Sequence, residues 1–396
     1  MHAIDDIVIL SGSRTAIGSF GGSLSGFSPA ELGSFAAQSA ISQAGVDATA
    51  IDHAVFGHII TTAPQDAYLA RHIALSVGMA QSSAAFNVNR LCGSAVQSVI
   101  SAAQMLMLGD SLLALAGGAE CMSRGAYLLP GLRTGLRMGS APVTDLTLGI
   151  LSDPFGSGHM GLTAERIASQ YQLSRQQLDE FALQSQQKAA AAISAGHFSG
   201  QITPVTVTQG KNSRIFLQDE HPRPDTSLPS LAALKPAFSK EGIVTAGNSS
   251  GLNDGAAALV LSSRQYAQSH GLGIRARLRG YSFAGVAPEV MGLGPIPAVQ
   301  QLLKKTGLSV TDLAVIESNE AFAAQAIAVS QSLGFDEARV NPNGGAIALG
   351  HPVGATGSIL IIKAMYELER IDGQFALVTM CIGGGQGVAL LLERCS

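Results

Sequence analysis

The sequence predicts an α/β fold made of two similar halves with an insertion between them. Short β-branched runs alternate with alanine-rich helical patterns, which is typical of sheets covered by helices. The two ends of the chain repeat one order of segments, which indicates an internal duplication. Of the 396 residues 46% are hydrophobic and 13% charged, so the chain can form a large core and does not belong to the disordered class.

In the first half we expect a strand, a helix that ends at Gly45, and two more strands, at residues 7–10, 30–44, 54–56 and 112–116. Residues 91–109 carry no charged side chain and have the length of a membrane-spanning helix. Their three serines and two glutamines favour a helix that protein buries on all sides, so we expect no membrane contact.

The second half repeats this order. We expect a helix, a strand, a helix and two strands at residues 299–306, 313–317, 358–368, 375–380 and 388–392. The segment QAGVDATAIDHAVFG near residue 50 parallels KTGLSVTDLAVIES near residue 312. Val55 precedes Cys92 by 37 positions, and Val315 precedes His351 by 36. The duplicated unit is therefore predicted to be a βαβ half.

The middle of the chain breaks this pattern. It holds a loop rich in glycine, arginine and methionine at 127–138 and a polar helix at 174–195, which Ser174 caps and Gly196 ends. We therefore divide the chain into an N-terminal half, an inserted domain and a C-terminal half, at residues 1–121 (completed by about 251–271), 122–250 and 272–396.

Composition excludes several classes of protein. The net charge is −4 with no basic stripe, so we expect no nucleic-acid partner. The four cysteines form no C-x-x-C pair, so neither a zinc site nor a disulfide framework is expected, and we predict no metal. The first ten residues carry acids where a signal peptide would be basic, so we expect a cytoplasmic protein.

Cys92 stands where a strand-like segment meets Gly93 and a long apolar helix. The backbone N–H groups and the positive dipole end of a helix stabilise a thiolate, so we expect a lowered pKa for this thiol. The alternative is a buried cysteine that only packs as a small apolar side chain.

His351 lies in NPNGGAIALGHPVGATGS, where five glycines from Gly344 to Gly357 would let the backbone approach a ligand closely. No lysine follows the last glycine, so the segment is not a P-loop. A histidine on the surface of a loop is the alternative. The surrounding glycines favour a functional histidine.

Two further segments carry candidate residues. Cys381 ends a strand in CIGGGQG, where a second strand follows, so the glycines predict a hairpin turn rather than a dinucleotide site. Asn319 follows the strand at 313–317. Its amide side chain either caps a helix, or it binds a water or orients His351. Because ligands collect at the carboxyl ends of strands, we expect two thiols, an imidazole and an amide to meet in one acyl-transfer site.

At these residues the sequence resembles the thiolase family, and the resemblance covers the whole chain. The matching blocks are NRLCGSA, HMGLTAE, TAGNSSGLNDGAA, VMGLGPIPA, NEAFAAQA, NPNGGAIALGHPVGATG and CIGGGQG. The resemblance implies two βαβαβαββ halves in a five-layered αβαβα arrangement, with residues 122–250 as a loop domain that covers the CoA.

The resemblance also implies an acetyl-CoA C-acyltransferase that works through an S-acyl-cysteine. Such an enzyme condenses two acetyl-CoA to acetoacetyl-CoA and CoA in a Claisen reaction, and cleaves 3-ketoacyl-CoA with CoA in reverse. CoA and its thioesters are then substrates, and no cofactor is expected. A homo-oligomer is implied, a dimer of dimers with residues 127–138 in the tetramerisation region.

By match to the family's motifs, Cys92 would be acylated, His351 would activate it, and Cys381 would move the α-carbon proton. Asn319 would hold a water of one oxyanion hole, which His351 helps to form, and the N–H groups of Cys92 and Gly383 would form the other. The residues that match CoA and pantetheine positions are Arg223, Ser250, Phe238, His159, Met160, Met291 and Phe322.

The chain departs from the family pattern at Ala95, usually glycine, at Ser318, usually alanine, and at Cys121, usually serine. The Ala95 methyl would either crowd the pocket or stiffen the helix, and Ser318 would affect the aim of Asn319. Two other functions stay open at this point. A ketoacyl synthase-type condensing enzyme is disfavoured by Cys381, and a non-catalytic acyl-CoA or lipid-binding relative is disfavoured by the full set of catalytic residue types.

Overall fold

A computed structural model describes residues 3–210 and 212–395 of the protein. Its core is an eleven-stranded sheet, in which nine strands follow one another in a single hydrogen-bonded order. The order is β4-β3-β5-β13-β1-β14-β17-β16-β15. The first five of these strands in chain order are β1 (Ile7–Thr15), β3 (His53–Gly57), β4 (Ala84–Val88), β5 (Leu113–Cys121) and β13 (Asn253–Ser263). The last four are β14 (Ala276–Gly285), β15 (Leu313–Ser318), β16 (Phe375–Ile382) and β17 (Gln386–Arg394).

The two halves have the same strand order, which confirms the predicted duplication. In the N-terminal half β3 is parallel to β5, while β5 and β13, and β13 and β1, are antiparallel. In the C-terminal half β15 is parallel to β16, while β16 and β17, and β17 and β14, are antiparallel. In the N-terminal half β4 also pairs in parallel with β3. At the corresponding place in the C-terminal half, Val340 forms a single parallel bridge with β15. A short antiparallel contact of Val8 and Ile9 in β1 with β14 joins the halves.

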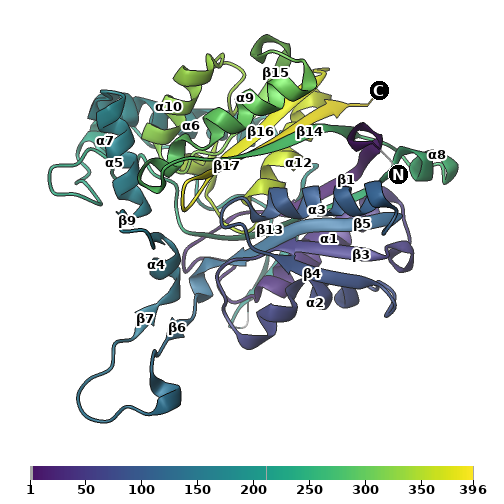
Figure 1. Ribbon diagram of the computed structural model, residues 1–396, viewed down its shortest axis with the longest axis horizontal. Helices are drawn as coiled ribbons and strands as arrows, with labels where there is room; N and C mark the ends of the chain where they lie inside the picture. Colours follow the sequence, from purple (N-terminus) through teal and green to yellow (C-terminus); the bar gives the residue numbers. More distant parts are fainter. Residues whose placement is uncertain (1–2, 211, 396) are drawn as a thin grey trace.

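The strands of the two halves form two layers, and helices form a layer between them and one on each outer side, so the fold has five layers (Figure 1). The middle layer holds α3 (Ser94–Leu108) and α12 (Thr356–Arg370), between the strands of the two halves. The outer helices are α1 (Pro29–Ala44) and α2 (Leu69–Ser76) on one side, and α9 (Pro295–Thr306) and α10 (Ala323–Leu333) on the other. The predicted αβαβα arrangement is confirmed.

Successive side chains of a strand point to opposite faces of the sheet, so one strand can pack against helices on both faces. In β1, Ile7 and Ile9 join the central apolar cluster with α3 and α12. Val8 and Leu10 join the cluster with α1 and α2. Such a strand is buried on both faces, so a run of apolar residues rather than an apolar–polar alternation marks it in the sequence.

Every helix and strand predicted for the two halves is present, but several are longer. β1 extends five residues past the predicted end at residue 10, through Ser11, Gly12 and Arg14. These residues have little strand propensity, and their pairing with β13 supplies the hydrogen bonds that keep them extended. The helix predicted at 174–195 is α6 (Arg175–Ser194), which begins with a capping box of Ser174 and Gln177.

By length and hydropathy the segment Leu91–Leu108 could cross a membrane. In this structure its helix, α3, packs against β3, β5 and α12, and most of its residues are buried within the protein. The prediction of a core helix is therefore confirmed.

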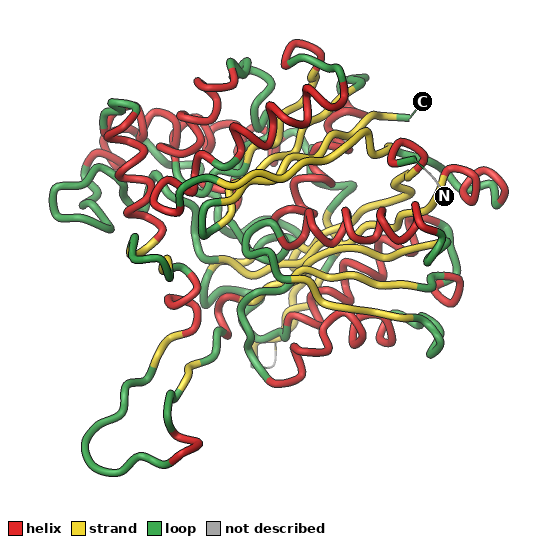
Figure 2. Tube along the Cα trace, viewed as in Figure 1, coloured by secondary structure: helices red, strands yellow, loops and turns green. Residues whose placement is uncertain are grey.

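Apart from the long helix α6, the insertion consists of short elements, most of them beside the sheet (Figure 2). Its helices are α4 (Leu146–Ile150), α5 (Met160–Gln170), α6 and α7 (Leu228–Ala232). Its strands are β6 (Tyr127–Leu128), β7 (Thr144–Asp145), β8 (Ser152–Asp153), β9 (Gly158–His159), β10 (Ile202–Thr203), β11 (Val205–Gln209) and β12 (Asn212–Phe216). Residues between β6 and β7 form an arm that projects from the body (Figure 1). The remaining short elements are β2 (Gly18–Ser19), α8 (Arg264–Ser269) and α11 (Ala346–Leu349).

Candidate active site

One cavity of about 550 Å³ lies where the catalytic loops of both halves meet the insertion. Of the twelve predicted site residues, eleven line it. They are Cys92, His159, Met160, Arg223, Phe238, Ser250, Met291, Phe322, His351, Cys381 and Gly383. The twelfth, Asn319, lies behind His351 and contacts its ring. Segments almost 300 residues apart in the sequence therefore contribute to one site.

Cys92 lies between β4 and α3, in the turn before the helix. Leu91, just ahead of it, has a left-handed backbone (φ 46°), and Gly93 is the N-cap residue of α3. The predicted lowering of the thiol pKa is wrong: burial raises the pKa to about 11. The N–H groups of Gly383 and Cys92 itself oppose this shift but do not overcome it. A base must therefore take the proton when this thiol reacts.

His351 is held by two side chains that sequence reasoning missed. Asn253 accepts a hydrogen bond from the backbone N–H of His351 (2.9 Å). The Thr356 hydroxyl donates to the carbonyl of Pro352, so it accepts from Nδ1 of His351 at 2.6 Å. The proton of the neutral ring is thus on Nδ1, and Nε2 carries the lone pair. Burial lowers the pKa of His351 to about 4, so the ring is a neutral base at pH 7.

Asn319 directly follows β15 and does not cap a helix. The helix α10 begins only at Ala323, with Phe322 at the N-cap position, so the capping interpretation is wrong. The amide Nδ2 of Asn319 lies 3.4 Å from Nε2 of His351, as the alternative interpretation predicted. Within the described residues, no group hydrogen-bonds to its buried Oδ1. This oxygen is therefore free to accept a bond from a ligand or a water.

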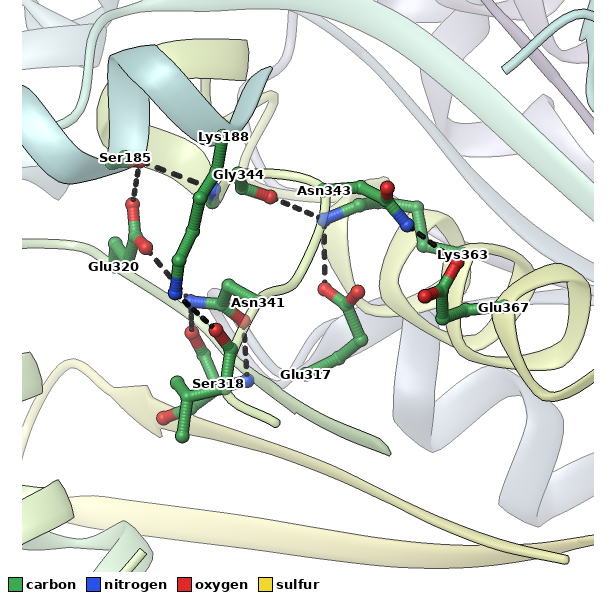
Figure 3. A network of polar contacts seen from close by, with 12 residues as sticks. Ser185, Lys188, Glu317, Ser318, Glu320, Asn341, Asn343, Gly344, Lys363 and Glu367 are labelled. Carbon is green, nitrogen blue, oxygen red and sulfur yellow. Dashed lines mark hydrogen bonds and ion pairs between the residues drawn. The ribbon is translucent and has the colours of Figure 1, made fainter. Parts of the chain in front are cut away.

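A buried polar network fixes the backbone on either side of Asn319 (Figure 3). Next in the chain, the Glu320 carboxylate accepts hydrogen bonds from Ser185 of α6 (2.6 Å) and from Asn341 (2.8 Å). Two residues before it, Glu317 receives the ammonium of Lys363 of α12 at 2.7 Å. Three separate segments thus converge on the loop that carries Asn319.

Cys381 and Gly383 lie where β16 turns into β17. The glycines at 384 and 385 both have left-handed backbones, which confirms the predicted hairpin turn. Burial raises the pKa of the Cys381 thiol, and the neighbouring Cys92 adds to this shift. Cys381 is therefore a neutral thiol at pH 7 and can donate a proton.

Aromatic and sulfur-containing side chains form the outer wall of the cavity. His159 stacks on Phe238 with ring centroids 4.8 Å apart, and Phe322 meets Phe238 edge to face at 5.9 Å. Met160 and Met291 are both buried in the same apolar cluster as Cys381. Flat rings and flexible thioethers suit a narrow passage for a linear ligand.

Two further residues predicted to contact CoA, Ser250 and Arg223, also line the cavity. The backbone N–H of Ser250 donates to the carbonyl of Ala321 at 3.0 Å. Arg223 is exposed at the cavity edge, beside His221, a lining residue that sequence reasoning missed. A proline on each side of Arg223 and the histidine before it were the available signal, in HPRP.

The glycines near His351 act differently from the prediction. They let the backbone approach other protein segments, not a ligand. A Cβ atom at Gly350 would lie 2.5 Å from the side chain of Asn253, and one at Gly354 would lie 2.4 Å from Glu120. The glycines thus allow the loop to pack against the N-terminal half, which brings His351 to Cys92.

Comparisons with known proteins agree with this geometry. Residues 7–265 match the family model of the thiolase N-terminal domain, and residues 272–394 match that of the thiolase C-terminal domain. The beta-ketothiolase BktB of Cupriavidus necator is 52% identical, over 98% of this chain and 99% of the relative. The acetyl-CoA acetyltransferase of Pseudomonas aeruginosa is 47% identical, over 99% and 100%. A crystal structure of human mitochondrial 3-ketoacyl-CoA thiolase in complex with CoA superposes with a TM-score of 0.95 at 39% identity, over 98% of both chains.

Proposed function

Since this chain belongs to the thiolase family, we propose that its cavity transfers acyl groups between CoA thioesters through an S-acyl intermediate on Cys92. The protein is an acetyl-CoA C-acyltransferase. It condenses two acetyl-CoA to acetoacetyl-CoA and CoA, and it cleaves 3-ketoacyl-CoA in reverse. The single observation that supports the roles of the residues is the meeting of Cys92, His351 and Cys381 in one cavity beside Asn319.

In thiolysis His351 removes the proton of the Cys92 thiol with Nε2, the ring nitrogen that carries the lone pair. The thiolate attacks the 3-keto carbon of the substrate, and the bond between carbons 2 and 3 breaks. Cys381 then gives its proton to carbon 2 of the leaving acetyl-CoA enolate. The raised pKa of the Cys381 thiol suits this role, because the group must hold a proton at neutral pH and recover it afterwards.

In the second half of the reaction the Cys381 thiolate takes the proton of the CoA thiol, and the CoA sulfur attacks the S-acyl-cysteine. Acyl-CoA leaves, and the released Cys92 thiolate takes its proton back from His351. Two sets of donors face the oxyanions that form. The backbone N–H groups of Cys92 and Gly383 face the sulfur of Cys92, and we assign them to the oxygen of the acyl group that this sulfur carries. Asn319, through a water, and His351 are assigned to the enolate oxygen.

Long CoA thioesters would enter along the wall of His159, Phe238 and Phe322, with the pantetheine arm between the rings and the thioethers. We assign Arg223 to the phosphate groups at the cavity edge, where its guanidinium is exposed. No cofactor enters this scheme, since both reactants are CoA compounds. The two thiols fit this chemistry better than they fit the decarboxylating ketoacyl synthase, which has no second cysteine.

We extend the proposal to assembly and location. The arm between β6 and β7 exposes apolar side chains, among them Leu132, Leu136 and Met138, which fit a contact between copies in a dimer of dimers. Light scattering of the protein and of Leu132→Glu tests this assembly, with a smaller particle expected for the variant. All four cysteines are free thiols, which suits a reducing cytoplasm.

The division of labour between the thiols is tested by mass spectrometry of the intact protein after exposure to acetyl-CoA. The wild type and Cys381→Ser should gain one acetyl group, whereas Cys92→Ser should gain none at a comparable rate, because a hydroxyl is a much weaker nucleophile. Cys381→Ser should in addition lose exchange of the acetyl protons with solvent. Acetylation of Cys92→Ser at the wild-type rate would refute the assignment of the nucleophile.

A further inference from the structure

A buried histidine outside the cavity lies between two buried carboxylates. His58 follows β3, Glu120 lies in β5, and Asp66 lies in the short helical turn Pro64–Tyr68. The Nδ1 atom of His58 is 3.1 Å from Oε1 of Glu120, and its Nε2 is 3.7 Å from Oδ2 of Asp66. All three residues are less than 9% exposed.

The neighbours of His58 favour its doubly protonated form. Nδ1 faces the backbone carbonyl of Ala119 at 3.0 Å as well as Glu120, and neither oxygen can donate. Nε2 faces only the carboxylate of Asp66 among the described residues. A neutral ring would turn a lone pair toward one of these acceptors, so an imidazolium fits both sides. Burial alone would lower the pKa of His58, but Glu120 and Asp66 together raise it to about 10.

Glu120 connects this ring to the active site. Its two oxygens accept hydrogen bonds from the backbone N–H groups of Ile59 and Ile60, each at 3.1 Å. The side chains of Ile59 and Ile60 form an apolar cluster with Val353, two residues after His351, and Cys92 packs against this cluster. Ile59 also lines the cavity. The carboxylate thus holds a wall that touches both the nucleophile and the loop of the base.

Glu120 also acts on Cys92 through its charge. Its negative charge adds to the rise in the pKa of the Cys92 thiol, and it acts in the same direction on Cys121. Any cation beside Glu120 reduces this effect. Since His58 is the ionisable group in direct contact with Glu120, it sets how much negative charge Cys92 meets.

We propose that His58 is a positioning residue for acylation: as an imidazolium it holds the Glu120 carboxylate under the cavity wall and compensates its charge close to Cys92. The inference rests on the proposed role of Cys92 as the acylated residue. It adds to the reaction a histidine that touches no substrate. We call His58, Glu120 and Asp66 the triad, and we expect the net charge of the triad to affect the reactivity of Cys92 more than the presence of the imidazole ring does.

The triad carries a net charge of −1 if all three groups are ionised, so substitutions can change the charge in both directions. His58→Gln keeps a donor for Ala119 and lowers the charge to −2. Asp66→Asn raises the charge to 0, and its amide oxygen still accepts from the N–H groups of Thr62 and Ala63, which bond to Asp66 at 2.6 and 3.0 Å. The double variant returns to −1. His72→Gln, at an exposed position on α2, is the matched control.

The experiment measures the rate of iodoacetamide alkylation at Cys92 against pH, together with kcat for thiolysis of acetoacetyl-CoA. We expect about tenfold slower alkylation for His58→Gln at pH 7.5, equivalent to a rise of one unit in the thiol pKa. The double variant should recover most of this loss. Asp66→Asn alone should react about threefold faster than the wild type, in line with one unit charge acting at a distance through protein. The kcat values should follow the same order.

Two outcomes would overturn the inference: His58→Gln with a wild-type pH profile, or a double variant that reacts no faster than His58→Gln. If His58→Gln does not fold, Asp66→Asn decides through kcat, because a loosened site could speed up alkylation of a buried thiol but would not raise kcat. A different failure concerns the proposed function. If acetyl-CoA leaves Cys92 unmodified in the wild type, the role of the nucleophile is wrong, whatever the triad does.

Discussion

At the scale of single residues, Ser318 departs from the family pattern, and its hydroxyl makes no hydrogen bond within the described residues. Its side chain is buried. The backbone of Ser318 holds Asn341 through both its N–H (2.9 Å) and its carbonyl (2.8 Å). Asn319 is therefore aimed by main-chain bonds, and the hydroxyl does not enter its positioning.

We expect Ser318→Ala to raise the free energy of unfolding by about 1 kcal/mol, because an unpaired buried hydroxyl is removed. Activity should stay near that of the wild type. Ser185→Ala is the control, since its hydroxyl does donate to Glu320, and it should lose stability by a similar amount. Urea unfolding of both variants gives the comparison, and a Ser318→Ala variant less stable than the wild type would contradict the prediction.

Ala95 is the second departure, and it does not crowd the cavity. It is fully buried in the first turn of α3, close to Gly118 of β5, and does not line the cavity. Met160 and Met291, whose side chains are flexible, line the cavity and pack in the same apolar cluster as Cys381. One added methylene in an apolar pocket changes binding by about 1–3 kcal/mol.

We therefore expect 3-ketovaleryl-CoA to be cleaved with a kcat/KM within about a hundredfold of that for acetoacetyl-CoA. Ala95→Gly should leave this ratio unchanged and lower the stability by about 1 kcal/mol, the cost of glycine in a helix. Thiolysis rates for both substrates, in both proteins, test the prediction. A ratio that shifts toward the longer substrate in Ala95→Gly would show that the methyl does limit the pocket.

At the scale of elements, α12 is tied to the loop of Asn319 by a buried ion pair. Lys363 donates to Glu317 and to the carbonyl of Gly344, both at 2.7 Å, and the two side chains are at most 1% exposed. Burial raises the pKa of Glu317, and the ammonium of Lys363 opposes that rise. The pair thus connects the middle helix layer to two loops of the active site (Figure 3).

Lys363→Met should destabilise the protein by about 3–5 kcal/mol, because it leaves a carboxylate buried without its partner. Adding Glu317→Leu should recover most of the loss, since a matched apolar pair avoids that penalty. Thermal unfolding of the single and double variants measures both effects. A double variant as unstable as Lys363→Met would mean that the bond to Gly344, and not the charge pair, holds the segment.

The elements also show what the sequence can and cannot predict. Apolar runs such as residues 375–380 and 388–392 identify buried strands directly, because both faces of these strands meet helices. The site residues are recognisable by type and by family motif. Partners such as Thr356 and Asn253 were missed, since nothing in the local pattern shows that Asn253 reaches a loop 98 residues away. The pKa of Cys92 was mispredicted for a related reason: burial outweighs the helix terminus, and burial depends on distant segments.

At the scale of the whole molecule, the buried groups His351, Asp66 and His58 each make stability depend on pH. His351 has a folded-state pKa of about 4, below the usual 6.5, so its proton favours the unfolded chain and stability falls as pH drops from 6.5 toward 4. The nearby imidazolium of His58 and the hydrogen bonds from Thr62 and Ala63 outweigh burial and lower the pKa of Asp66 to about 2. Its stabilisation is present above its unfolded pKa of about 4 and is lost as pH falls toward 2.

His58 acts in the opposite direction. Its folded-state pKa is about 10, above the usual 6.5, so its proton favours the folded state. This stabilisation is fully present below pH 6.5 and is lost as pH rises from 6.5 to 10. His58→Gln should therefore be least stable relative to the wild type at pH 6.5 and below, and its stability should approach that of the wild type near pH 10. Urea midpoints from pH 5 to 10, at one protein concentration because subunit association adds to stability, would show this convergence. A deficit that stays constant with pH would mean that His58 stabilises the fold by packing, without its charge.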